Sequence, residues 1–125
     1  MINQLKKLIR ENLIQIEGVK EVSFQMAKDD ALFPHIVYYF DGDRALTDDN
    51  HRRDFSLFID VWDKSTDSTL CNELTDSIVA LFQAKNIPTE EILPTFYYES
   101  TTRVIDEDKT IKHNQIKFTV QNYER

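Results

Sequence analysis

Acidic residues and one histidine cluster within residues 41–53, where they could hold a divalent cation. The possible ligands are Asp41, Asp43, Asp48, Asp49 and His51. Oxygen-rich clusters of this kind suit calcium or magnesium. The spacing does not match an EF-hand, because Leu46 stands where that loop requires glycine. We therefore interpret the segment as a solvated loop and predict no bound metal.

A second candidate for chemistry is the acidic stretch Glu107-Asp108-Lys109. Some metal-dependent nucleases activate water with an acid and a lysine at this spacing, and Asp60 is a conceivable second metal ligand. Such a pair should sit on a rigid strand, whereas this one falls in a predicted turn. The favoured interpretation is a charged turn, and we predict no catalytic residue and no cofactor.

The histidines and exposed aromatics carry no catalytic signature. His35, His51 and His113 have no Cys or Ser partner at a recognisable spacing, so we expect surface or pocket-lining side chains. Phe58 and Trp62 fall on one face of a predicted strand, opposite its regular apolar residues. Two large aromatics there imply a partly covered face. The cover is either a loop of the same chain or a neighbouring subunit, and the sequence does not choose between them.

Composition narrows the class of protein. The 125 residues fit a single domain, 1–125, and the formal charge of −7 argues against a surface that binds nucleic acid specifically. Cys71 is the only cysteine, which rules out an internal disulfide and suits a reducing cytoplasm. No apolar run is long enough to span a bilayer, so we expect no membrane association.

Hydrophobic periodicity predicts the elements that must position these residues. Apolar residues recur at helical spacing over residues 2–16, with Gly18 as a stop, and over the segment that ends at Gln83. Alternation predicts strands over 22–26, 35–40, 54–63, 96–104 and 116–121. Residues 41–53 are left as a long exposed loop. The order predicts an α+β fold: a mostly antiparallel sheet of about four to five strands with two helices packed on one face.

Several stretches together resemble a known family. They are Asp54-Phe-Ser-Leu-Phe-Ile-Asp-Val-Trp-Asp63 with the helix after it, Ile92-Leu-Pro-Thr-Phe-Tyr97, and Asp106-Glu-Asp-Lys-Thr-Ile-Lys-His-Asn-Gln115 followed by Lys117-Phe118. In this order they resemble the small tail terminator, or tail completion and head-tail joining, proteins of long-tailed bacteriophages. The resemblance spans nearly the whole chain, but its motifs are strand and turn patterns.

The resemblance implies a structural role without enzyme activity. Such a subunit assembles with itself, typically as a hexameric ring, on the end of the tail tube, stops polymerisation, and meets the head connector proteins. It implies a place at the head-proximal end of the virion tail, after assembly in the host cytoplasm, with DNA passing through the ring. We expect subunit contacts from Asp41, Arg44, Arg52, Arg53, Phe58 and Trp62. The first alternative is a small cytoplasmic ligand- or partner-binding α+β domain. The second, less favoured, is a metal-dependent nuclease.

Overall fold

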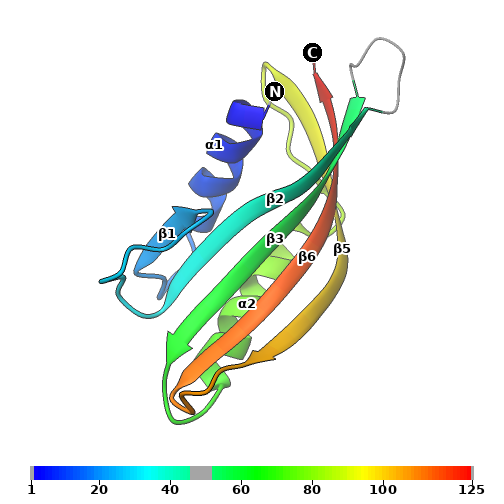
Figure 1. Cartoon of the computed structure of the whole chain (residues 1–125). Helices are drawn as coiled ribbons and strands as arrows, with labels where there is room; N and C mark the ends of the chain where they lie inside the picture. The colour runs from blue at the N-terminus through cyan, green and yellow to red at the C-terminus, as the bar shows by residue number, and fades with distance from the viewer. Residues whose placement is uncertain (1, 46–51, 125) are drawn as a thin grey trace.

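Six strands form one twisted sheet, and two helices cover one of its faces within the part of the chain that the structure describes (Figure 1). This computed structural model describes residues 2–45 and 52–124, and the side chains within 2–41 and 52–124. The helices are α1 (Ile2–Leu13) and α2 (Thr69–Phe82). The strands are β1 (Glu21–Phe24), β2 (His35–Ala45), β3 (Arg52–Lys64), β4 (Lys85–Asn86), β5 (Ile92–Ile105) and β6 (Ile111–Glu124).

The sheet has the order β1-β2-β3-β6-β5-β4. Among the described strands, β1 and β2 alone pair in parallel, and the remaining pairs are antiparallel. The α+β class and the mostly antiparallel sheet are therefore confirmed, whereas the prediction of four to five strands was wrong. The strand that was missed is β4, which has only two residues and follows directly on α2. A strand so short carries no alternating pattern that a sequence could reveal.

Both helices pack on the same face of the sheet. The side chains of β3 alternate as expected, so that Leu57 and Ile59 point into the core under the helices and are fully buried. The hydroxyl of Tyr38 on β2 donates a hydrogen bond to the Lys6 carbonyl of α1 at 3.0 Å. Cys71 of α2 lies with its sulfur 3.8 Å from the Val61 carbonyl of β3. One continuous apolar core thus joins both helices to the central strands.

The described parts of the predicted loop at 41–53 are strand in the structure. Residues 41–45 continue β2 and residues 52–53 begin β3, so the two strands form a long hairpin. Asp and Gly have low strand propensity, which is why no alternating pattern is visible here. Pairing with β3 overrides that local preference, and a bulge between Asp41 and Asp43 takes up the irregularity. Residues 46–51, with Asp48, Asp49 and His51, lie outside the described part.

The ends of the first helix differ slightly from the prediction. α1 ends at Leu13 rather than at Ile16, and the chain then turns through Gly18. The prediction that Gly18 stops the helix was therefore wrong; with φ +93°, a conformation that residues other than glycine rarely adopt, it lies in the turn that follows. Within the described residues, neither helix has the length and apolar character needed to cross a membrane.

Candidate functional site

Three rings form a row across the sheet on the face turned away from the helices. His35 of β2 lies opposite Trp62 of β3, and Trp62 lies opposite His113 of β6. The Trp62 and His113 rings are stacked with centroids 3.6 Å apart, and His35 lies at 6.2 Å on the other side of Trp62. The sequence analysis saw two unrelated histidines, but strand pairing brings them into one cluster. We call this set the ring row.

A buried carboxylate belongs to the same cluster. Oδ1 of Asp60 lies 3.0 Å from Nε2 of His113, and both residues are 8% exposed. His113 is therefore buried rather than a surface side chain. The Nδ1 atoms of His35 and His113 have no hydrogen-bond partner among the described residues. Buried nitrogens without partners are costly, so the cluster has unused capacity for hydrogen bonds.

The chain itself supplies part of the cover over the ring row. Residues 25–33, here called the cover segment, connect β1 to β2 and flank a pocket of about 430 Å³. His35, Asp60 and Trp62 form part of its sheet side, and Phe33 lies 4.9 Å from the His35 ring. The two sources of cover that the sequence left open are thus partly resolved. A loop of the same chain lies beside Trp62, which remains half-buried.

Burial controls the ionisation of this face. It lowers the pKa of His35 below the ordinary 6.5, because the charged ring would lose its hydration, and the nearby Leu32 carbonyl and Glu21 only partly oppose this. Burial also raises the pKa of Tyr39, with the charges of Asp60 and Asp41 acting in the same direction. His35 is consequently neutral near pH 7, with a ring nitrogen that can accept a hydrogen bond.

Phe58 belongs to a second aromatic pair on the same face. Its ring stacks on Tyr39 of β2 at 5.2 Å, and the ammonium group of Lys117 lies 5.9 Å from the ring centre. The Tyr39 hydroxyl accepts a hydrogen bond from the Gln115 amide at 2.9 Å. Phe58 is half-buried, so part of this pair remains available for contact with another molecule.

The four charged residues expected at subunit contacts lie along the β2–β3 hairpin. Asp41 is exposed opposite Ser56, and Arg44 pairs in the ladder with Asp54. Arg52 forms an ion pair with Asp54 at 3.3 Å and lies over the Tyr123 ring. Arg53 is half-buried on β3. Trp62 is ten positions along β3 from Arg52, roughly 33 Å away, so the six expected residues do not form one patch.

The residues weighed for a nuclease are kept apart by the fold. Asp106 and Asp108 accept backbone hydrogen bonds within the turn between β5 and β6, and the hydroxyl of Thr110 also bonds Asp108. Lys64 at the end of β3 pairs with Ile111, which follows that turn. Asp60 lies four residues before Lys64 on β3. That spacing is about 13 Å of strand. Among the described residues, no group of three or more His, Cys, Asp or Glu could hold a metal ion.

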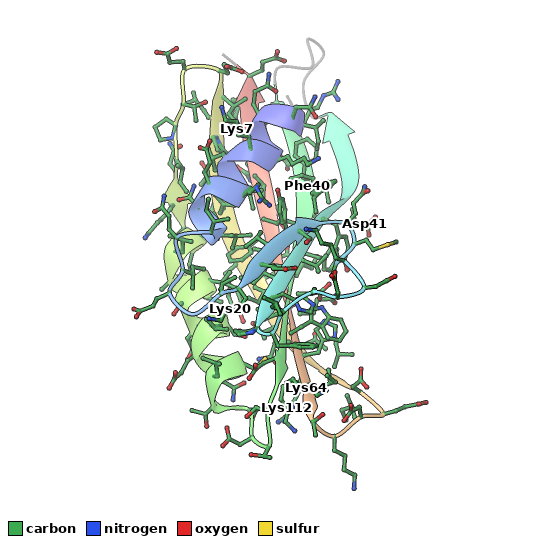
Figure 2. All side chains as sticks on the ribbon, turned by 90° about the vertical axis from the view of Figure 1, so that its left-hand side faces the viewer. Lys7, Lys20, Phe40, Asp41, Lys64 and Lys112 are labelled. Atoms are coloured by element: carbon green, nitrogen blue, oxygen red, sulfur yellow. The ribbon has the colours of Figure 1, made fainter. Side chains whose placement is uncertain are left out.

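Two unpaired strand edges were missed by the sequence analysis. β4 covers the outer edge of β5 only at Thr95 and Phe96, and no described strand pairs with that edge over residues 97–105. On the opposite side, β1 pairs with β2 only as far as Tyr38. Figure 2 shows Phe40 and Asp41 on the part of β2 beyond β1, with Lys64 and Lys112 toward the other end of the sheet. Edge exposure depends on strand order, which local patterns do not encode.

Solved structures share this fold. A chain in the virion of a native gene transfer agent particle has a TM-score of 0.68, with 7% identity over 94% of this chain and 92% of that one. The gp17 protein of bacteriophage SPP1 has a TM-score of 0.54, with 20% identity over 94% of this chain and 88% of that one. Comparison with protein-family models and with curated proteins finds no match. The chain is therefore similar in fold to these two proteins over nearly its whole length.

Proposed function

We propose that this chain is a structural protein of a phage or phage-like virion, which forms a ring on the end of the tail tube. The ring would stop tail polymerisation and form the tail side of the head-tail junction. The fold shared with a gene transfer agent virion chain and with SPP1 gp17 supports a virion role. The observation that carries the ring is the pair of free strand edges on opposite sides of the sheet.

The free edge of β5 has the properties of an attachment site. Residues 99–105 are exposed, and Ile105 is 90% exposed. Long, open edges rich in β-branched residues invite pairing with another strand, and proteins that stay monomeric usually shorten or cover them. A strand from another subunit would satisfy the open backbone groups of this edge.

The free edge of β2 provides a matching partner. The strands β3 and β6 lie between β2 and β5, and all three pairings from β2 to β5 are antiparallel. The strands β2 and β5 therefore run in opposite directions. The β2 strand of a second copy placed beside β5 would continue the antiparallel pattern without interruption. Because the two edges differ, the contact is heterologous, and repeating it produces a closed ring when the rotation fits.

The two free edges are displaced from each other along the strand direction, and this displacement favours closure of a ring. Thr102, near the middle of the free β5 edge, is level with Val37 on β2, whereas the middle of the free β2 edge lies five residues farther on, at Gly42. Five residues span about 17 Å along a strand. The four strands from one free edge to the other, β2, β3, β6 and β5, are together about 19 Å wide. Joining the edges therefore tilts the strands by about 40°, within the 35–45° that closed barrels adopt.

Termination then requires only surface complementarity. One end of the ring would match the last layer of the tube, and the other end would differ from a tube subunit, so that no further subunit adds. The hairpin residues Asp41, Arg44, Arg52 and Arg53 are proposed subunit contacts, because they lie at the open end of β2 and β3. Exposed ion pairs contribute only about 0–1 kcal/mol each, so backbone pairing would supply most of the affinity.

Native mass spectrometry over a concentration series tests the ring. We expect a six-subunit species, and a monomer at every concentration would contradict self-assembly. Thr101→Pro and Thr102→Pro test the edge, because neighbouring residues direct their N–H groups to opposite sides of a strand. One proline removes an N–H that bonds β6 and should lower the free energy of unfolding. The other removes an N–H that points out of the sheet, so it should keep the wild-type free energy of unfolding. That variant should no longer form the ring.

A further inference from the structure

The pocket between the cover segment and the ring row has features that assembly of subunits into a ring does not require. It combines aromatic side chains, Trp62 and Phe33, with the buried carboxylate of Asp60 and the ring of His35. Asp60 is only 8% exposed, yet it lines the pocket. A pocket that serves only to fill space would not place a buried carboxylate at its wall.

The charges and acceptors at the pocket indicate the class of ligand. Asp60 contacts His113 through Oδ1, and no hydrogen bond from a described residue to its Oδ2 is found. Asp29 on the cover segment adds a second carboxylate, while Lys28 is a single opposing charge. Two carboxylates against one ammonium group favour a cationic hydrogen-bond donor over an anion.

The aromatic walls distinguish between the two cationic side chains. A guanidinium group is planar, stacks on aromatic rings, and donates several hydrogen bonds in fixed directions. An ammonium group is compact and more strongly hydrated, so it gains less from Trp62 and Phe33. We propose that this pocket binds the guanidinium group of an arginine presented by a partner protein, with Asp60 as its hydrogen-bond acceptor and Trp62 as its aromatic contact.

Trp62 is the only tryptophan in the chain, so its fluorescence reports on the pocket directly. The probe is N-acetyl-arginine amide, and the matched control is N-acetyl-citrulline amide, which has nearly the same shape without the charge. We expect a saturable change in emission with the arginine compound, with a dissociation constant on the order of 1–10 mM. The citrulline compound should produce no saturable change. Equal responses to both compounds would overturn the proposal.

Two substitutions test the assigned contacts. Asp60→Asn keeps an oxygen acceptor for His113 but removes the charge, and should weaken binding about tenfold. Lys28→Ala changes an exposed residue, so folding is not at risk, and removing its repulsion should strengthen binding about threefold. Urea unfolding confirms that both variants are folded. Unchanged affinity in both would exclude this pocket as the arginine site, whatever the oligomeric state of the protein.

Discussion

Asn114 of β6 donates a hydrogen bond from its side-chain amide to the Thr75 hydroxyl of α2 at 3.0 Å, in the buried contact between helix and sheet. The same amide also donates to Asn72 at 3.1 Å, and the Thr75 hydroxyl donates to the Cys71 carbonyl. Apolar packing alone does not fix how far a helix is rotated on a sheet. These directional bonds give α2 one preferred position over β6.

Thr75→Val should lower the free energy of unfolding by about 1–2 kcal/mol, because Asn114 then loses one buried acceptor while the shape of the side chain is kept. Urea unfolding measures the change. Ser77→Ala is the matched control, because Ser77 makes a similar backbone bond on the exposed side of α2 and should cost under about 0.5 kcal/mol. The double variant Thr75→Val/Asn114→Leu should cost less than the sum of the single changes. Additive costs would show that the bond does not couple the two residues.

His113→Ala should destabilise the chain by about 2–4 kcal/mol. The substitution leaves the Asp60 carboxylate buried without its partner and removes the ring stacked on Trp62. Chemical denaturation followed by Trp62 fluorescence measures both the stability and the local environment. Lys109→Ala, in the exposed turn before β6, serves as the control and should stay within about 0.5 kcal/mol of wild type. An unchanged free energy of unfolding in His113→Ala would mean that the cluster contributes nothing to folding.

The pKa of His35 gives a prediction for pH. Burial holds this pKa below the ordinary 6.5 that applies in the unfolded chain, so between the two values the unfolded state binds more protons. The free energy of unfolding should therefore fall as pH drops from 7 to 5. Urea titrations at several pH values, compared with His35→Asn, isolate this contribution because the variant should show a flatter profile. Carboxylates with lowered pKa values, such as Glu99, titrate below this range. Parallel profiles for both proteins would contradict the assignment.

Neighbouring positions on β3 should respond differently to truncation. Leu57→Ala creates a cavity under the helices and should cost about 2–5 kcal/mol. Phe58→Ala removes a half-buried ring from the opposite face and should cost less in stability. If Phe58 contributes to subunit contact, native mass spectrometry should show weaker assembly at a stability that still gives a folded monomer. Undiminished assembly of Phe58→Ala would remove Phe58 from the interface.

The sequence by itself determined the elements whose patterns are local. The apolar spacing of both helices and the alternation of Phe55, Leu57, Ile59 and Val61 correctly identified the buried faces, because side-chain direction follows directly from helix and strand periodicity. The resemblance to phage tail proteins rested on the order of these elements, and structures with the same fold come from a virion and a phage.

Tertiary structure alone decided the clusters and edges. The ring row depends on the pairing of three strands, which joins His35 to a residue 78 positions later in the chain, His113, and no local pattern records that distance. The conversion of residues 41–45 into strand likewise came from pairing with β3 against weak local preference. The free edges of β2 and β5 follow from the strand order of the whole sheet. Register and strand order are set by contacts between distant segments, and these form only when the core is assembled.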